Sequence, residues 1–297
     1  MKYFIVLFFS LMLIGSLKSQ ELEPRNYAVL PVGLNVAALG YIYSSGDIVS
    51  DATSPIKDLE LTSNSFVASY VRTFGMFGKL ARVQVLSPYV LLGGNLKVNG
   101  RDTSGSRSGF ADTKIKFGIN LIGSPAMEPK DMMKFSEKFV LGTSVVITVP
   151  TGQYYNERLI NLGSNRWGIK PEIGMSYKLG SFYFEFFTGI WMFTKNSEFL
   201  KTNTVTQEPI LSLQSHVSYL FPSKIWISGN VGYSGGGDSQ VNGVDKNDFQ
   251  RNVRSGLTLS VPFSISHSVK ASVNTGVTTR VGGNFTTYSL IYQYIWF

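Results

Sequence analysis

Apolar and polar residues alternate with a period of two through most of the sequence after residue 28. The clearest stretch is 167–179, where the odd positions are mostly large apolar residues and the even positions are glycine, serine, lysine or glutamate. The stretches 114–121, 256–261 and 269–278 repeat this pattern. Because the side chains of a β-strand point alternately to its two faces, each segment is predicted to be a strand with one apolar and one polar face.

Clusters of glycine, proline, serine and asparagine separate the alternating segments and mark the turns between them. The pattern predicts twelve strands, at residues 29–43, 60–76, 79–96, 110–123, 137–149, 166–178, 181–194, 208–220, 224–235, 250–262, 267–279 and 284–296.

The connections between these strands are of two kinds, which alternate along the chain. Short turns are expected at 77–78, 179–180, 221–223 and 263–266, and long polar loops at 44–59, 97–109, 150–165, 195–207 and 236–249. Two connections fit less well, because 124–136 is long and 281–283 is short. Long loops on one rim and short turns on the other are typical of outer-membrane β-barrels of Gram-negative bacteria. The predicted fold is therefore an all-β, transmembrane antiparallel barrel of about twelve strands. The alternative is a soluble β-sandwich, whose strands are usually shorter, about 5 to 6 residues.

The composition agrees with a folded, aromatic β-protein. The 297 residues are 43% hydrophobic and 15% charged, with 30 glycines and 21 phenylalanines, and this excludes a disordered chain. The lack of cysteine excludes a disulfide scaffold and a thiol nucleophile. No uncharged apolar run beyond the first twenty residues is long enough for a transmembrane helix.

The two ends of the chain carry signals of their own. Met1 and Lys2 precede an apolar run from Phe4 to Ile14, which is typical of a secretory signal peptide. We expect a signal peptide over 1–19, with cleavage near Ser19, and a single outer-membrane barrel over 20–297. The aromatic strand that ends at Phe297 is the kind that the outer-membrane assembly machinery recognises. The formal charge of +8 is spread over strands and loops, so we expect contact with anionic lipopolysaccharide rather than with nucleic acid.

Several stretches resemble one protein family beyond the statistics of barrels. They are Leu-Pro-Val-Gly-Leu-Asn at 30–35 with the segment 41–46, Gly-Phe-Ala-Asp-Thr-Lys at 109–114, Pro-Thr-Gly-Gln-Tyr at 150–154, and Asn-Leu-Gly-Ser-Asn-Arg-Trp at 161–167. Together they resemble the MetA-pathway of phenol degradation family of outer-membrane proteins. The resemblance spans most of the chain after the signal peptide. It implies an outer-membrane barrel that passes aromatic or other small hydrophobic compounds.

The polar face of the strands is predicted to line the lumen of the barrel. Twelve strands enclose a space between that of eight strands, which side chains nearly fill, and that of sixteen, which leaves an aqueous channel. Strand parity places these charged side chains inside: Arg72, Arg82, Lys114, Lys116, Lys170, Glu172, Glu185, Arg254 and Lys270. Cations dominate, so the lumen either favours anions or pairs its charges across the wall.

Four aromatic side chains have the same inward parity and are candidates for a relay of rings: Tyr183, Phe187, Trp191 and Trp226. Rings stacked along the lumen would give an apolar solute a series of contacts.

Other chemistry has little support. His216 and His267 are the only histidines, and without cysteine they do not make a common transition-metal site. A barrel-wall lipase would pair a serine with one of them. Ser215 precedes His216, and Ser266 and Ser268 flank His267, but serine is abundant in all barrels, so we expect no enzyme, no catalytic residue, no metal and no cofactor. The sequence predicts passive passage of small solutes, aromatic or anionic, through a narrow basic lumen. A structural or surface barrel with a filled lumen is the alternative.

Overall fold

The computed structural model describes residues 22–49, 57–98, 101–132, 134–158 and 160–297. The predicted signal peptide and its cleavage site lie outside these residues. The elements, in chain order, are β1 Asn35–Val49, β2 Lys57–Met76, β3 Lys79–Val98, β4 Arg101–Phe110, β5 Thr113–Ile122, α2 Pro129–Met132, β6 Phe139–Val149, β7 Gly168–Leu179, β8 Phe182–Phe193, β9 Asn196–Phe199, β10 Asn203–Gln207, β11 Ile210–Leu220, β12 Trp226–Gly236, β13 Ser239–Val241, β14 Val244–Asp245, β15 Gln250–Pro262, β16 His267–Thr279 and β17 Gly282–Trp296.

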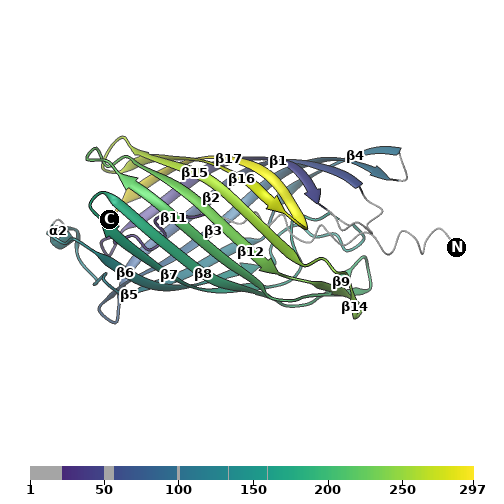
Figure 1. Ribbon diagram of the computed structural model, residues 1–297, viewed down its shortest axis with the longest axis horizontal. Helices are drawn as coiled ribbons and strands as arrows, with labels where there is room; N and C mark the ends of the chain where they lie inside the picture. Colours follow the sequence, from purple (N-terminus) through teal and green to yellow (C-terminus); the bar gives the residue numbers. More distant parts are fainter. Residues whose placement is uncertain (1–21, 50–56, 99–100, 133, 159) are drawn as a thin grey trace.

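The described strands form a closed antiparallel barrel (Figure 1). Around the wall the order is β1-β2-β3-β5-β6-β7-β8-β11-β12-β15-β16-β17. The first and last strands pair along their whole length, from Asn35 opposite Trp296 to Val49 opposite Gly282, and this pairing closes the sheet. β5 pairs with residues 81–86 of β3, and β4 pairs with residues 89–98 of the same strand. β4 therefore continues beside β3 beyond the outward end of β5. The predicted barrel of twelve strands is confirmed.

The wall strands lie close to their predicted ranges, with three differences. The first strand is Asn35–Val49 rather than 29–43. It begins later because the preceding residues enter the lumen, and it extends into the expected loop 44–59, whose residues 57–59 belong to β2. The expected loop 97–109 consists mainly of β4, which pairs with β3. The expected loops 195–207 and 236–249 contribute a second, four-stranded sheet, β14-β13-β10-β9.

The exterior of the barrel is apolar. On β7 the outward residues Ile169, Ile173 and Met175 are exposed, whereas the inward Lys170 and Glu172 are buried. This order is the reverse of that in a water-soluble protein, and a continuous apolar exterior requires lipid around it. Closed antiparallel barrels with this pattern are found in the outer membrane of Gram-negative bacteria. The protein is therefore an outer-membrane β-barrel rather than a soluble sandwich.

The described helix α2 is short, and in the part of the chain that the structure covers no helix is long and apolar enough to span a membrane.

The two rims differ as the loop pattern indicates. The helix α2 and the C-terminus lie at one end of the barrel, whereas β4, β9 and β14 lie at the other (Figure 1). Short turns face the periplasm and long loops face outward in barrels of this class, so we refer to the α2 end as the periplasmic end. The long connection between β5 and β6 lies there. Its Met127, Met132 and Phe135 pack against the apolar cluster that contains Tyr27 and Val29, which explains why a long connection occurs where a short turn is expected.

Candidate functional site: the lumen

The residues Leu22–Leu34, here called the N-terminal segment, lie inside the barrel. Arg82 of the wall donates hydrogen bonds to the carbonyls of Asn26 and Ala28, the second at 3.1 Å. Asn120 Nδ2 donates to the carbonyl of Tyr27 at 3.2 Å. Wall side chains thus bind the backbone of the segment, and the segment occupies space that an open pore would leave to water.

Tyr27 is the best-buried side chain of the N-terminal segment, at 2% exposure. Its ring lies over Gly142 of β6 and Gly174 of β7. A Cβ atom at either glycine would come within 2.2 Å of the ring. The ring also meets Phe187 edge to face, with centroids 5.2 Å apart. The wall therefore has a notch without side chains that accepts one aromatic ring.

The hydroxyl of Tyr27 is also bound. It donates to Glu172 Oε1 at 3.2 Å and lies 3.1 Å from Ser144 Oγ. Burial and the neighbouring carboxylate raise the pKa of Tyr27, so the phenol remains protonated and able to donate. Glu172 also accepts from Asn26 Nδ2 at 3.2 Å and from Lys170 Nζ at 2.8 Å.

Charged side chains of the wall hold the rest of the N-terminal segment. Lys116 forms an ion pair with Glu23 at 2.9 Å, and this cation, assisted by Lys170 and Lys270, lowers the pKa of Glu23 to about 2. Lys116 and Lys170 come from β5 and β7, which only β6 separates, whereas Lys270 comes from β16 on the opposite side of the barrel. The Glu23 carboxylate therefore lies in positive potential from both sides of the lumen.

The segment also reaches Glu185 and Tyr183 on β8. The backbone N–H of Arg25 donates to Glu185 Oε2 at 2.8 Å. The Arg25 guanidinium lies 3.5 Å from the centroid of the Tyr183 ring, a cation–π contact.

Most of the side chains predicted to face inward do so. Arg82, Lys116, Lys170, Glu172 and Glu185 touch the N-terminal segment or one another. Lys114 and Lys270 have the same inward parity as Lys116 and the buried Ser268, respectively. Arg254 is buried and donates to the carbonyl of Phe285 at 2.6 Å. Pairing of lumen charges, which the sequence left open, is thus found at several of these positions.

Arg72 is on the other face of the wall, so its predicted inward position is wrong. It is exposed, and its Nη1 donates to Asn35 Oδ1 at 2.8 Å. The exposed Phe66 and Tyr70 share its parity, whereas Thr73 is fully buried. The sequence is ambiguous here because serine occurs on the lumen side of β2 and a charged residue occurs on the outer side.

Three of the four candidate relay residues lie on β8, namely Tyr183, Phe187 and Trp191. Arg25 covers Tyr183 and Tyr27 covers Phe187. Trp191 instead stacks on Phe193, with centroids 6.2 Å apart and an angle of 6°.

Trp226 lies apart from these three at the start of β12, where it pairs with Leu220 and Ser260. Among the described residues no ring contact joins it to the others.

At the outward end, the loop 150–167 between β6 and β7 packs into the mouth of the barrel. Its Ile160 and Leu162 contact an apolar cluster made by Ile48, Leu59, Leu61, Val90, Leu92 and Phe285. Asp112 holds this loop in place. Its Oδ1 accepts from the N–H of Gly152 at 3.0 Å, and its Oδ2 accepts from the N–H and hydroxyl of Ser164 at 2.8 and 2.6 Å. The motifs at 109–114, 150–154 and 161–167 thus meet at one carboxylate.

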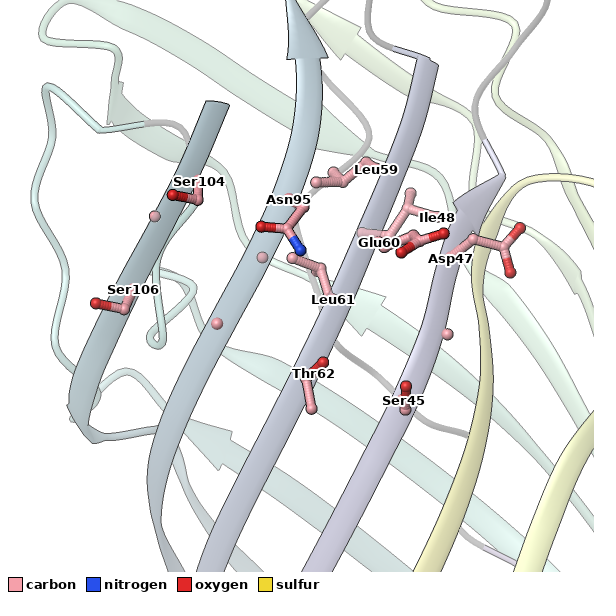
Figure 2. Close-up of a pocket in the computed structure, with 14 residues that line it drawn as sticks. Ser45, Asp47, Ile48, Leu59, Glu60, Leu61, Thr62, Asn95, Ser104 and Ser106 are labelled. Atoms are coloured by element: carbon pink, nitrogen blue, oxygen red, sulfur yellow. The ribbon is translucent and has the colours of Figure 1, made fainter. Parts of the chain in front are cut away.

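A separate open cavity of about 1120 Å³ lies on β1, β2, β3 and β4 (Figure 2). Asp47, Glu60, Asn95 and Ser104 form one polar row across the four strands, each opposite the next in register. These side chains are exposed and have the parity opposite to that of Leu61, which packs in the mouth cluster. The polar row of the cavity is therefore on the outer side of the wall, and Ile48, Leu59 and Leu61 of the mouth cluster also border the cavity.

The two histidines lie in different parts of the barrel. His216 is buried in the lumen, with Nδ1 2.8 Å from Asn230 Oδ1. His267 lies near the periplasmic end, 2.6 Å from the hydroxyl of Tyr292. Neither imidazole ring is hydrogen-bonded to a serine side chain in the described part of the chain.

The sequence interpretation missed Tyr27, Gly142, Gly174 and the role of Asp112. A signal for the N-terminal segment exists in the run Glu-Leu-Glu-Pro-Arg-Asn at 21–26, which is too charged for a lipid-facing strand. The notch has no such signal, because it depends on which glycines the register places opposite each other.

Comparison with known proteins agrees with this architecture. A family model described as "Putative MetA-pathway of phenol degradation" matches residues 44–293. An outer membrane channel from Pseudomonas putida F1 superposes with a TM-score of 0.77 at 20% identity, over 93% of this chain and 100% of that one. The transport unit of the autotransporter AIDA-I from Escherichia coli gives 0.51 at 13% identity, over 96% and 95%. No curated protein sequence matches the chain. At 20% and 13% identity, these two superpositions show that the chain shares the fold of both proteins.

Proposed function

The chain belongs to the MetA-pathway of phenol degradation family, and from this premise we propose that it is a passive outer-membrane channel for small aromatic or anionic solutes. The observation that carries the proposal is a closed wall, apolar outside, around a charged lumen. The N-terminal segment narrows this lumen. Solutes cross by diffusion past the segment, without a cofactor or an energy source.

The charge of the lumen supports a preference for anions. The inward cations of the wall include Arg82, Lys114, Lys116, Lys170, Lys178, Arg254 and Lys270, whereas its inward carboxylates include Glu172 and Glu185. Even with Glu23 neutralising part of this charge, the potential of the lumen stays positive and raises the local concentration of anions.

The inward rings of β8 support a preference for aromatic solutes. Trp191 and Phe193 present stacked faces near the outward end, where a flat solute would arrive first. Tyr183 and Phe187 become available to a solute only when Arg25 and Tyr27 leave them. A relay over all three β8 residues therefore requires displacement of the N-terminal segment.

A filled, non-transporting barrel is the second candidate. It is favoured by the same segment and by the loop 150–167, which together occupy both ends of the lumen.

Planar-bilayer and liposome measurements separate the two. We expect the protein without its signal peptide to give discrete current steps with an anion-selective reversal potential and to swell liposomes in small solutes. A variant that lacks residues 22–31 should conduct several times more. Current only in this variant would identify a filled barrel, and no current in either form would contradict a channel.

Further proposals concern enzyme activity, barrel assembly and contact with lipopolysaccharide. We propose that the protein is not an enzyme, because its histidines bind Asn230 and Tyr292 rather than a serine nucleophile. We also propose that β17, which closes the barrel, is the strand that the assembly machinery recognises, and that basic loops contact lipopolysaccharide. Phospholipid hydrolysis that disappears in His216→Ala would contradict the first proposal.

A further inference from the structure

Two buried polar groups near the outward end of the lumen lack partners among the described residues. Arg166 is 6% exposed, and its Nη1 has no hydrogen bond, although Nη2 donates to Gln207 Oε1. Thr148 is 4% exposed, and its Oγ1 also has no partner. Buried donors are usually satisfied, so two neighbouring exceptions require an explanation. Burial lowers the pKa of Arg166 to about 10, which leaves the side chain charged at neutral pH.

Both groups border the same gap in the wall. Gly168 of β7 lies directly opposite Thr148 of β6, and Arg166 is two residues away on the same inward side. A Cβ atom at Gly168 would lie 3.4 Å from Thr148 Cβ and 3.5 Å from the Phe193 ring. The missing side chain therefore leaves a gap of about one methyl group between Thr148 and the Phe193 ring.

Aromatic faces and a second cation continue inward from this gap. The Arg166 guanidinium lies 4.7 Å from the Phe193 ring centroid. Phe193 stacks in parallel with Trp191, and Lys170 Nζ lies 5.4 Å from the Trp191 centroid. Donors and ring faces thus follow one another along β7 and β8.

We propose that Thr148, Arg166, Phe193 and Trp191 form a binding site for aromatic carboxylates. The carboxylate accepts hydrogen bonds from Arg166 Nη1 and Thr148 Oγ1, and the ring of the solute packs on Phe193 and Trp191. A charge-assisted bond to arginine is strong and directional, and two donors with a ring face distinguish an aryl acid from a simple anion or a neutral arene. The inference rests on the proposed function, because it names the solutes that the channel favours.

Equilibrium dialysis of the protein in lipid nanodiscs, with radiolabelled benzoate as the probe, tests the site directly. We expect saturable binding of one benzoate per chain. Arg166→Gln should weaken it at least tenfold, or about 1.4 kcal/mol, and Thr148→Val should weaken it less. Arg158→Gln removes an exposed arginine from the same loop and should leave the affinity unchanged. Cyclohexanecarboxylate should compete more weakly than benzoate, and benzyl alcohol should not compete.

The site would be overturned by any of three results. These are an equal loss of benzoate affinity in Arg166→Gln and Arg158→Gln, competition by benzyl alcohol as strong as that by benzoate, and the absence of saturable benzoate binding. Heat-dependent migration on gels reports whether each variant forms a closed barrel. If Arg166→Gln does not fold, the competition series on the unaltered protein and Thr148→Val still decide the outcome. Flux of benzoate into liposomes is measured separately. Binding without flux of any solute would reject the channel and keep the site, whereas flux without saturable benzoate binding would reject the site alone.

Discussion

Gly142 and Gly174 lie opposite each other on β6 and β7, and the ring of Tyr27 occupies the space that two side chains would otherwise fill. This arrangement makes the wall and the N-terminal segment complementary. The segment is therefore held by shape as well as by hydrogen bonds, and substitutions in the wall alone should release it.

Gly174→Ala is expected to expel the N-terminal segment without opening the barrel. The new Cβ atom would lie 2.1 Å from Tyr27 Cε2 and 2.7 Å from Phe187 Cδ1, and overpacking of this kind costs about 1–3 kcal/mol. Single-channel conductance should rise several-fold. Gly229→Ala is the matched control, since nothing lies within 4 Å of a Cβ atom there. Unchanged conductance in a folded Gly174→Ala variant would contradict the notch.

Tyr27→Ala should release the segment from the other side of the same contact. Removal of a buried aromatic side chain costs about 3–5 kcal/mol, whereas Tyr27→Phe loses only the hydroxyl bonds, about 1 kcal/mol. The conductance should therefore rise strongly in Tyr27→Ala and slightly in Tyr27→Phe, while the gel mobility of both stays that of a folded barrel. Equal conductance in the two variants would show that the ring does not hold the segment.

The barrel follows from the sequence because its determinant, alternation with a period of two, is local. Strands such as β15 and β16 begin and end at the predicted residues. The residues just before β1 are also apolar, and this pattern predicts a strand that begins at residue 29. Pro31 has no N–H to donate to a sheet, and Gly33 has a φ of 81° that ends extended structure.

The contents of the lumen could not be predicted in the same way. Parity assigns a side chain to the inside only where the two faces differ in polarity, and Arg72 on β2 shows how the assignment fails where they do not. The Glu23–Lys116 pair joins residues 93 positions apart, so it depends on the path of the N-terminal segment rather than on local pattern.

Acid should loosen the segment through Glu23. Its pKa is lowered to about 2 by Lys116, Lys170 and Lys270, whereas a solvated glutamate has a pKa of about 4.3. A lowered pKa means that the stabilisation is fully present above about 4.3 and is lost as the pH falls toward 2. We therefore expect constant conductance from about pH 7 to 5 and a rise below about pH 4. Because the Glu23 side chain is 38% exposed, solvent screens part of the effect.

Glu23→Gln separates this carboxylate from the others that touch the segment. The variant should conduct more at neutral pH and should show a smaller rise in acid. Glu128→Gln removes an exposed carboxylate at the periplasmic end and should keep the full response. An acid response of the same size in Glu23→Gln would show that Glu23 does not contribute.

Asp112→Ala should free the loop 150–167 from the mouth of the barrel. The substitution removes three bonds to one carboxylate, and a hydrogen bond to a charged group is worth about 1.5–3 kcal/mol. Loss of even one such bond raises the fraction of molecules in which the loop is detached from the mouth about tenfold. Cleavage by trypsin after the exposed Arg158 follows this fraction, so digestion should be at least tenfold faster while the barrel stays folded.

Asp112→Asn keeps an acceptor oxygen, and its digestion rate should be intermediate. Asp238→Ala, in another loop, should digest like the unaltered protein, and equal rates in Asp112→Ala and Asp238→Ala would mean that the loop is held by the apolar contacts of Ile160 and Leu162 alone.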